Sequence, residues 1–449
     1  MENTRELAVN MLLEILEQNK YSHLVIRNVL DKYDYMDGRD KAFLKRTTEG
    51  TLERKIEIDY VLDQFSRVPV AKMKPFIRNL LRISVYQLLF MDSVPESAVC
   101  NEAVKLAGKR GFKNLQGFVN GVLRNIDRRK EEISLPEAKK SPVDYLSVKY
   151  SMPVWLVKKF LSERGALQTE KILQSFLAVS PVTVRLKESL KEEERVALLK
   201  EMEKSGVRVK KHPYLPYAYE ILESEGISAL PGFTEGLFMV QDVSSMLVCE
   251  AAGIKRGDRV IDVCASPGGK ALHAAEKLQG TGFVSARDMT EYKAEMIRDN
   301  IRRMNARNAE ALVLDARQFR GEDVETADVL LCDLPCSGFG IIGKKKDIKY
   351  HASLEGLNQL KELQREILSV VCQYVKKGGV LIYSTCTINP DENEENVKWF
   401  TENFPFHTES FSPFLPECLK EEGKTGMLQL LPGIHETDGF FLARLRREE

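Results

Sequence analysis

Two cysteines stand in short polar motifs that could carry nucleophilic chemistry. Cys336 lies in DLPCSG at 333–338, and Cys386 lies in YSTCT at 383–387. Each motif continues a stretch that is expected to form a buried strand, so both thiols should lie at the same edge of one sheet. A thiolate there can attack an electrophilic carbon and form a covalent intermediate. A lone cysteine is most often a buried small side chain, whereas two at the ends of adjacent strands, with Asp333 close by, favour catalysis.

A glycine-rich turn follows the first strand of the same predicted sheet. Its sequence is DVCASPGGK at 262–270, and Gly268 and Gly269 allow a ligand to approach the backbone closely. The turn lies at the carboxyl end of a strand, where open α/β sheets bind their ligands. Its spacing matches neither the dinucleotide motif G-x-G-x-x-G nor the phosphate-binding loop G-x-x-x-x-G-K-[ST]. A nicotinamide oxidoreductase is therefore disfavoured.

Three aspartates end the next three predicted strands. Asp288 follows Gly269 by 19 residues, a distance at which an acid can hold the ribose hydroxyls of an adenosine-containing cofactor. Asp315 and Asp333 end the two strands after that one. A single acid at such a place is commonly a helix cap. Three acids at one rim, together with a glycine turn, indicate a cofactor site.

The rest of the composition narrows the class of protein. The eight cysteines form no C-x-x-C pair and the six histidines do not group near them, so neither a metal site nor a disulfide framework is indicated. The first residues lack the apolar core of a signal peptide. No uninterrupted apolar run reaches the roughly 18 residues that a transmembrane helix needs. We therefore expect free thiols, a cytoplasmic location and no membrane partner.

A sheet must position these motifs, and residues 236–449 have the pattern of one. Stretches of buried-strand type alternate there with helical stretches, which predicts a parallel α/β sheet with helices on both faces. The strands are expected at 260–264, 282–286, 311–314, 329–332 and 380–383, and the helices at 291–304 and 354–375.

Two further domains are expected before this one. Residues 1–130 show helical periodicity throughout, which predicts an all-α bundle. Residues 131–143 have the prolines and mixed charge of a linker, and 144–235 read as a small α+β domain. Its helices are expected within 145–164, where the pattern is helical after Pro153, and at 188–204. Its strands are expected at 182–186, 207–211 and 217–222.

Positive charge gathers at the end of the predicted bundle. The whole chain is balanced, with 66 basic and 66 acidic residues, so only a local excess can indicate a polyanionic partner. Between 109 and 130 the single acid Asp127 stands against Lys109, Arg110, Lys113, Arg124, Arg128, Arg129 and Lys130. This segment is either a phosphate-binding face or an ordinary solvated helix face.

The motifs together resemble those of a known family. CASPGGK at 264–270, DLPCSG at 333–338 and STCT at 384–387 are similar to the signature motifs of the Nol1/Nop2/Sun family of RNA cytosine-C5 methyltransferases. QDVSS at 241–245 and DGFF at 438–441 are similar to that family as well. Ser266 replaces a usual alanine. Lys346 replaces a common proline, which leaves the path of its loop open.

The bundle adds a second resemblance. Residues 1–130 are similar to the RNA-binding antitermination factor NusB. The two resemblances imply a Rossmann-like catalytic domain behind a NusB-like domain, with the middle domain contacting RNA as well. They imply 16S rRNA as the substrate, free or in an early assembly particle. No protein partner is implied, and we expect a monomer.

The resemblance implies S-adenosylmethionine as the cofactor and gives the site residues roles. The cofactor would be bound by Cys264, Ala265, Ser266, Pro267, Gly268, Gly269, Lys270, Asp288, Asp315 and Asp333. Cys386 is assigned the attack on carbon 6 of cytosine and Cys336 the release of the product, while Asp333 is suited to bond the Watson–Crick edge. The residue pattern alone does not rank the cysteines, because DNA cytosine methyltransferases use the cysteine of a Pro-Cys motif.

Other functions stay open at this point. A related enzyme could act on tRNA, another RNA or DNA. A non-catalytic ribosome-assembly factor could have kept the fold, although the intact set of Cys386, Cys336 and Asp333 argues against it.

Overall fold

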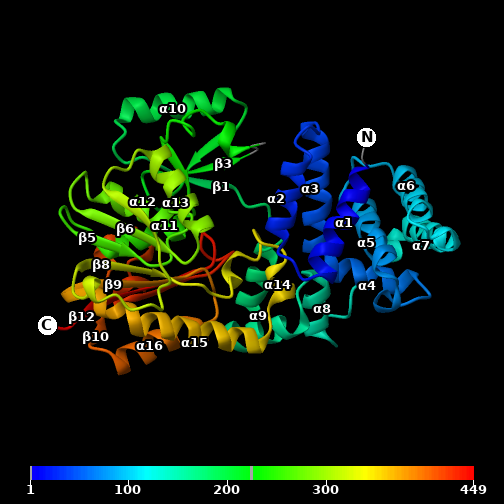
Figure 1. Ribbon diagram of the computed structural model, residues 1–449. Coiled ribbons are helices and arrows are strands. Elements are labelled where there is room, and N and C mark those ends of the chain that lie inside the picture. Colours follow the sequence, from blue (N-terminus) through cyan, green and yellow to red (C-terminus); the bar gives the residue numbers. More distant parts are fainter. Residues whose placement is uncertain (1–2, 223–225) are drawn as a thin grey trace. The chain divides into compact units, whose positions relative to one another are not determined.

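The computed structural model describes residues 3–222 and 226–449 (Figure 1). The chain divides into two compact units. The helical unit comprises the residues up to Ala178 together with Ile342–His351, and the sheet unit comprises Val179–Ile341 and Ala352–Glu449.

The helical unit is a bundle around one long apolar helix. Its elements are α1 (Thr4–Glu17), α2 (Ser22–Lys32), α3 (Gly38–Glu53), α4 (Lys55–Phe65), α5 (Pro75–Phe90), α6 (Glu96–Lys109), α7 (Gln116–Arg128), α8 (Pro142–Lys149), α9 (Val154–Ser175) and α14 (Ile348–His351). Proline at the first position of α5 suits a helix start, and residues on every side of α5 are buried. A helix that is buried all round forms the core of its bundle, so the predicted all-α domain is confirmed.

The helical stretch predicted within 145–164 forms two helices. α8 ends at Lys149 and α9 begins at Val154. Pro153 lies between them as the residue before α9. Proline has no N–H to donate and restricts the residue before it, so one continuous helix cannot run through this point.

A segment from the second half of the chain packs in the helical unit. Ile342–His351 includes α14 and contains buried Asp347. The Asp347 carboxylate accepts hydrogen bonds from the backbone N–H and the hydroxyl of Ser22, both at 2.7 Å. Lys346 forms an ion pair with Glu53. The lysine that replaces the usual proline therefore has a partner, and the path of its loop is that of an anchored segment.

The sheet unit contains a small antiparallel sheet in the order β2-β3-β1-β4. Its strands are β1 (Val182–Leu186), β2 (Arg208–Lys211), β3 (Ala218–Leu222) and β4 (Phe238–Val240). The amphipathic helix α10 (Glu192–Lys204) lies against this sheet and buries Leu198 and Met202 in its core (Figure 1). β4 pairs with β1, so this sheet continues to Val240.

The main sheet of the same unit has the order β10-β12-β9-β8-β5-β6-β7, and β11 pairs with β12. Its strands are β5 (Arg259–Asp262), β6 (Phe283–Asp288), β7 (Ala309–Val313), β8 (Ala327–Asp333), β9 (Val375–Thr385), β10 (Phe406–Thr408), β11 (Met427–Leu430) and β12 (Phe440–Arg447). β5 to β9 are parallel, as predicted. β10, β11 and β12 add antiparallel pairs, so the sheet is mixed and extends beyond the parallel strands that the sequence predicts.

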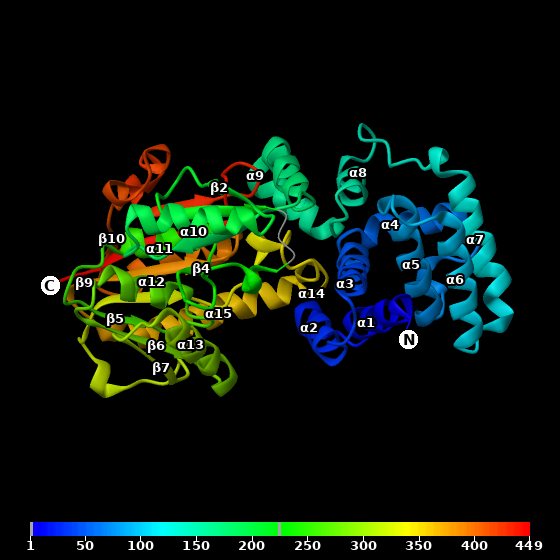
Figure 2. The same cartoon turned by 90° about the horizontal axis from the view of Figure 1, so that it is seen from above.

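Helices cover both faces of the main sheet. α11 (Val243–Ala252), α12 (Gly269–Lys277) and α13 (Glu291–Met304) bury apolar residues on one face, and α15 (Leu354–Val371) and α16 (Glu394–Asn403) bury theirs on the other. Successive residues of a strand point to opposite faces. Val260 accordingly packs in the first layer and Ile261 in the second. Figure 1 shows α12 on one side of the strands and α15 and α16 on the other, and Figure 2 looks down on the side of α12.

The strand order fixes where a ligand can bind. From β5 the chain proceeds through β6 and β7 to one side, and β8 then pairs with β5 on its other side. Ligands of open α/β sheets bind beyond the carboxyl ends of the strands at such a reversal. Within residues 3–222 and 226–449 the structure contains no helix with the length and hydropathy that crossing a bilayer requires.

Candidate active site

The two cysteines singled out by the sequence meet at the ends of neighbouring strands. β8 and β9 pair in parallel, with Asp333 opposite Ser384. Cys336 follows β8, and Cys386 is the residue directly after β9. The two Sγ atoms lie 3.3 Å apart, and both side chains are half-buried. Both thiols can therefore act on the same atom of a bound substrate.

Asp333 is held in place by two side chains. One carboxylate oxygen accepts from Nζ of Lys270 at 2.6 Å, and the other accepts from Oγ of Ser384 at 2.9 Å. Lys270 lies in the first turn of α12, which begins behind Gly268 with its φ of +106°. The glycine turn therefore carries the cation that orients Asp333.

Lys270 is positively charged at neutral pH in the folded protein. Burial alone would lower the pKa of Lys270, but the charges of Asp333, Asp262 and Cys386 together hold this pKa above its ordinary value. Attraction between charges is mutual, so the ammonium of Lys270 also stabilises negative charge on the Cys386 sulfur.

Cys336, in contrast to Lys270, is uncharged. The hydrogen bond with Cys386, burial, and the negative charges of Cys386 and Glu392 raise the pKa of the Cys336 thiol well above its usual range. Cys336 is therefore a neutral thiol at neutral pH, lying against the sulfur of Cys386.

Two glycines from distant motifs support the cysteine loops. The backbone N–H of Gly340 donates to the carbonyl oxygen of Cys386, and the N–H of Gly439 donates to the carbonyl oxygen of Gly340, both at 3.0 Å. A Cβ atom on Gly439 would collide with the backbone of Gly340, and one on Gly340 would collide with the backbone of Gly439. This close approach explains the glycine in DGFF at 438–441.

The motif QDVSS at 241–245 also has a structural role. The Asp242 side chain caps α11 by accepting from the N–H of Ser244 at 3.0 Å. It also accepts from the backbone N–H of Asp438 at 3.3 Å. The two outlying motifs are therefore bonded to one another.

Asp288 lies at the end of β6 beside the glycine turn. Its carboxylate accepts from the backbone N–H of Ser266 at 3.2 Å and of Met289 at 2.8 Å. The ammonium of Lys293 lies 3.0 Å away. The contact to residue 266 uses the backbone, so the serine that replaces the usual alanine leaves it intact.

Asp262, which heads the glycine turn, was not among the predicted cofactor residues. Its side chain is fully buried, and neither carboxylate oxygen has a hydrogen-bond donor in good geometry among the described residues. Burial raises the pKa of Asp262 to about 7. A buried carboxylate without donors is costly, and an ammonium-bearing ligand at this turn would satisfy it. Its place at a strand end before CASPGGK was the signal available in the sequence.

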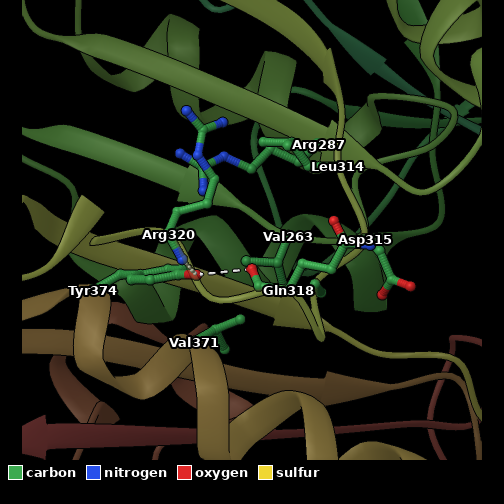
Figure 3. Close-up of a pocket in the computed structure, with 9 residues that line it drawn as sticks. Val263, Arg287, Leu314, Asp315, Gln318, Arg320, Val371 and Tyr374 are labelled. Atoms are coloured by element: carbon green, nitrogen blue, oxygen red, sulfur yellow. Dashed lines mark hydrogen bonds between the residues drawn. The ribbon is translucent and has the colours of Figure 1, made fainter. Parts of the chain in front are cut away.

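Asp315 follows β7 and lines a small recess (Figure 3). The recess is also lined by Val263, Arg287, Leu314, Ala316, Gln318, Arg320, Val371 and Tyr374. Tyr374 closes one side and donates to the carbonyl oxygen of Gln318 at 3.3 Å (Figure 3). Arg317 holds the Asp315 carboxylate at 2.7 Å. The residues around Asp315 thus offer apolar walls next to the cofactor turn.

The remaining predicted cofactor residues lie on the turn between β5 and α12 and in the first turn of α12. Cys264 is among them, and burial with the nearby Asp262 raises the pKa of its thiol. It is a neutral, unreactive thiol there, and its contribution is to shape the turn.

One group in the sheet unit has the composition of a metal site. Ligand atoms of Glu188, Glu250 and His273 lie within 4.8 Å of one another. The ammonium of Lys277 lies 2.6 Å from Glu250 and 3.0 Å from Glu188. A lysine therefore already stands where a cation would bind. Burial lowers the pKa of His273 to about 3, so its ring is neutral.

The basic run at 109–130 lies on α6, α7 and the residues after them, in the helical unit. Glu6 on α1 lies 2.6 Å from Lys109 and 3.4 Å from Arg110. Arg129 pairs with Glu132 at 2.6 Å. The excess counted along the sequence is therefore partly compensated by acids from other segments.

Comparisons with known proteins agree with these features. The family model of the 16S rRNA methyltransferase RsmB/F matches residues 252–446, and the NusB family model matches residues 2–128. "Probable ribosomal RNA small subunit methyltransferase B" of Bacillus subtilis is 36% identical over 99% of both chains. Its namesake in Synechocystis is 31% identical over 100% of both.

A solved structure extends the likeness to the whole fold. The crystal structure of PH0851 aligns with 100% of this chain and 99% of its own, with 27% identity and a TM-score of 0.80. These full-length relationships, and the methyltransferase motifs gathered at one sheet edge, lead to one assignment: the chain belongs to the RsmB/F family of S-adenosylmethionine-dependent 16S rRNA methyltransferases.

Proposed function

We propose that this enzyme methylates carbon 5 of a cytosine in 16S rRNA through a covalent bond between Cys386 and carbon 6 of the ring. The observation that carries the proposal is the 3.3 Å contact between the sulfur atoms of Cys336 and Cys386 beside an oriented Asp333. Two thiols and a carboxylate at one point suit the formation and the cleavage of a thioether to a base. Membership in the family of 16S rRNA methyltransferases supports the choice of RNA.

The residues of the glycine turn fit the cofactor. S-adenosylmethionine, when bound, supplies an electrophilic methyl group. Residues 264–270 would contact the cofactor through their backbone. Asp288 would hold the ribose hydroxyls of the cofactor, and the carboxylate of Asp262 would bind its ammonium group. Asp315 belongs to the same set through the recess that it lines.

Attack by Cys386 makes carbon 5 reactive. Carbon 5 of cytosine is a poor nucleophile in the intact ring. The thiol proton of Cys386 passes to N3 and its sulfur bonds to carbon 6. The ring electrons shift toward N3, and the ring becomes an enamine-like species whose carbon 5 is nucleophilic. The ammonium of Lys270 stabilises the sulfur anion that this step requires.

Asp333 orients the base during that attack. Lys270 and Ser384 fix its two carboxylate oxygens. We assign Asp333 a hydrogen bond to the Watson–Crick edge, at N3 or the exocyclic amine. The proton that Cys386 gives up is taken up at N3, where the Asp333 carboxylate accepts the N3–H hydrogen bond, so no negative charge stays on the ring as sulfur adds.

Cys336 serves the release of the product. Release requires loss of the carbon 5 proton to solvent and cleavage of the carbon 6–sulfur bond. The carbon–hydrogen pair re-forms the double bond between carbons 5 and 6, and the sulfur of Cys386 leaves with its own pair and regains a proton. Cys336 lies 3.3 Å from the sulfur that must leave. We therefore assign the two cysteines different roles, with attack by Cys386 and release by Cys336.

RNA binding involves the other parts of the chain in this proposal. The target base must leave its stack to reach the site, and the NusB-like domain (1–130) and the α+β domain (144–235) would hold the surrounding RNA. Residues 131–143 would link them, and 236–449 would form the catalytic domain. The enzyme would work as a cytoplasmic monomer on free 16S rRNA or an early assembly particle.

Sequencing of the product tests the proposal. Purified enzyme and S-adenosylmethionine are incubated with unmodified 16S rRNA, with assembling small-subunit particles or with tRNA, and 5-methylcytosine is mapped after bisulfite treatment. We expect one modified cytosine in 16S rRNA and none in tRNA. Methylation of tRNA alone would overturn the substrate, and a methyl group on any other base atom would overturn the chemistry.

A further inference from the structure

Glu392 is a fully buried carboxylate between the two cysteine loops. It lies in the short helix Pro390–Glu392, six residues after Cys386. Its oxygens accept from Ser337 N at 2.9 Å, Ser337 Oγ at 2.5 Å, Gln364 Nε2 at 3.0 Å and Asn389 Nδ2 at 2.9 Å. Burying a carboxylate is costly unless donors satisfy it. Four neutral donors converge here, so this part of the fold is built around the charge.

Two of these donors belong to the residue after Cys336. Both the backbone N–H and the hydroxyl of Ser337 point at Glu392. Gln364 on α15, also fully buried, bonds the carboxylate and at the same time donates to the carbonyl oxygen of Pro335 at 2.8 Å. The backbone on both sides of Cys336 is thereby fixed by the same group of side chains.

The other ties of Glu392 run to the loop of Cys386. The hydroxyls of Ser337 and Thr387 lie 2.7 Å apart. The carbonyl oxygen of Glu392 accepts from the hydroxyl of Tyr383 at 2.5 Å, and Tyr383 precedes Cys386 on β9. Asn389, which donates to the carboxylate, also donates its backbone N–H to Thr387. Glu392 therefore lies at the junction of both cysteine motifs.

We propose that Glu392 is a positioning residue of methyl transfer, which locks the loop of Cys336 onto the loop of Cys386 and so sets the contact between the two sulfur atoms. Its effect on turnover rests on the proposed function. Its effect on the geometry and charge state of Cys336 does not.

The charge of Glu392 should affect the ionisation of Cys336, which a purely structural role of Glu392 would not do. The groups that face Cys336 are Cys386, Glu392 and the Tyr383 hydroxyl, and Lys270 faces Cys386. The Cys386 hydrogen bond and burial contribute most to the raised pKa of Cys336, and the negative charge of Glu392 adds to them. Removing that charge should let Cys336 ionise at lower pH.

Three substitutions separate charge from geometry. Glu392→Gln keeps the length and removes the charge, whereas Glu392→Asp keeps the charge and shortens the reach. Glu395→Gln makes the same chemical change at an exposed position nearby and serves as the control. Each full-length variant is assayed for methyl transfer to 16S rRNA, for S-adenosylmethionine affinity, and for the pH dependence of iodoacetamide alkylation at Cys336, read by peptide mass spectrometry.

We expect a clear pattern across the three. Turnover falls on the order of a hundredfold in Glu392→Gln and Glu392→Asp, as for other small misplacements of reacting groups, while cofactor affinity stays normal. The alkylation midpoint of Cys336 moves to lower pH in Glu392→Gln and stays in place in Glu392→Asp. Glu395→Gln behaves as wild type. Wild-type turnover together with an unmoved midpoint in Glu392→Gln would overturn the proposal.

A further variant covers the case in which Glu392→Gln does not fold. Ser337→Ala removes one tie to the carboxylate and leaves its charge, so turnover should fall and the midpoint should stay. Normal turnover in both Ser337→Ala and Glu392→Asp would then overturn the proposal. Alkylation needs no RNA, so failure of the wild type to form 5-methylcytosine would count against the proposed function alone.

Discussion

The ammonium nitrogen of Lys270 lies 2.6 Å from a carboxylate oxygen of Asp333. Lys270 comes from the glycine turn behind β5 and Asp333 from the end of β8, which are neighbouring strands at the reversal of the sheet order. A single ion pair therefore joins the cofactor turn to the residue assigned to the base. In the proposed mechanism, this pair would link the orientation of the base to the cofactor turn.

Lys270→Met should separate these two functions. Without its cation, Asp333 loses its orientation and the Cys386 sulfur loses its stabilising charge, so we expect methyl transfer to fall on the order of a hundredfold. Calorimetric titration should find a much smaller change in S-adenosylmethionine affinity. Lys377→Met, at an exposed position on β9, is the control. Turnover within a factor of about two of wild type would remove Lys270 from the mechanism.

Cys336→Ala should trap the enzyme on its RNA. Attack by Cys386 and methylation still proceed, but release is impaired, so a covalent complex should survive denaturing electrophoresis. The complex should be absent from the Cys336→Ala, Cys386→Ala double variant, and Cys418→Ala, at an exposed thiol, should release product normally. If Cys386→Ala accumulates the complex and Cys336→Ala does not, the two roles are reversed.

Asp262 should make cofactor binding depend on pH. Its pKa, raised by burial to about 7, leaves the carboxyl group increasingly protonated as the pH falls below that value. A protonated carboxyl no longer attracts an ammonium, so the affinity for S-adenosylmethionine should weaken between pH 7 and 5.5. Titration calorimetry of wild type and Asp262→Asn over this range tests this. The same slope in both proteins would show that Asp262 does not meet the cofactor's ammonium.

Lys349 should make the stability of the helical unit rise with pH. Its ammonium is buried and donates to the carbonyl oxygens of Ser151 at 2.6 Å and Glu53 at 2.7 Å. Burial lowers the pKa of Lys349 to about 7, whereas the unfolded chain keeps a pKa near 10.4. Between these values the unfolded state binds more protons, so the free energy of unfolding increases with pH by at most about 1.4 kcal/mol per pH unit.

The matched variant for this effect is Lys349→Met. Melting temperatures of wild type and variant are compared at pH 7 and pH 9. We expect the melting temperature of wild type to rise relative to that of the variant as the pH rises, because the free-energy cost of burying a charged lysine disappears. A constant difference between the two proteins would mean that Lys349 is charged in the folded protein throughout this range.

Arg124 and Arg128 on α7 should contribute to the salt dependence of RNA binding. Within the described part of the chain, no carboxylate lies within ion-pair distance of either side chain, unlike Arg129, which pairs with Glu132. Phosphate contacts release counterions, so losing both residues to alanine should flatten the slope of log affinity against log salt by about 0.7 per lost contact to single-stranded RNA. Arg129→Ala is the control with a smaller expected effect.

The competing interpretation of this segment is a solvated helix face. It expects an unchanged salt slope in the Arg124→Ala, Arg128→Ala variant. Cofactor affinity should be normal under either interpretation, and a melting curve establishes that the variant is folded before the slopes are compared.

Much of the architecture follows from local patterns in the sequence. β1 spans Val182–Leu186 and α13 spans Glu291–Met304, the same ranges that alternation and helical periodicity predict. The sequence also predicts the position of the three motifs, because each stands at the end of a stretch with a strand pattern. These motifs are at 262–270, 333–338 and 384–387. Local spacing was enough here, since each element's own residues decide its type.

Other features were decided by contacts between distant segments. β12 (Phe440–Arg447) carries Arg444 and Arg446, which break a strand's apolar pattern, and Glu409 from another segment forms ion pairs with both of them. Glu6 compensates Lys109 across more than a hundred positions of sequence. The anchoring of Asp347 on Ser22 is of the same kind.

The features of the site also fall into those set by local sequence and those set by tertiary contacts. The sequence by itself determined that two thiols, an acid and a glycine turn would stand at strand ends. Only the tertiary structure decided that Glu392 would join the two cysteine loops. It also decided that Asp262 would have no donor in good geometry among the residues that the structure describes, because burial and hydrogen bonding depend on which segments meet. The chemical type of a side chain is given by its own residue. Its charge state and its orientation are set by the neighbours that the fold brings against it.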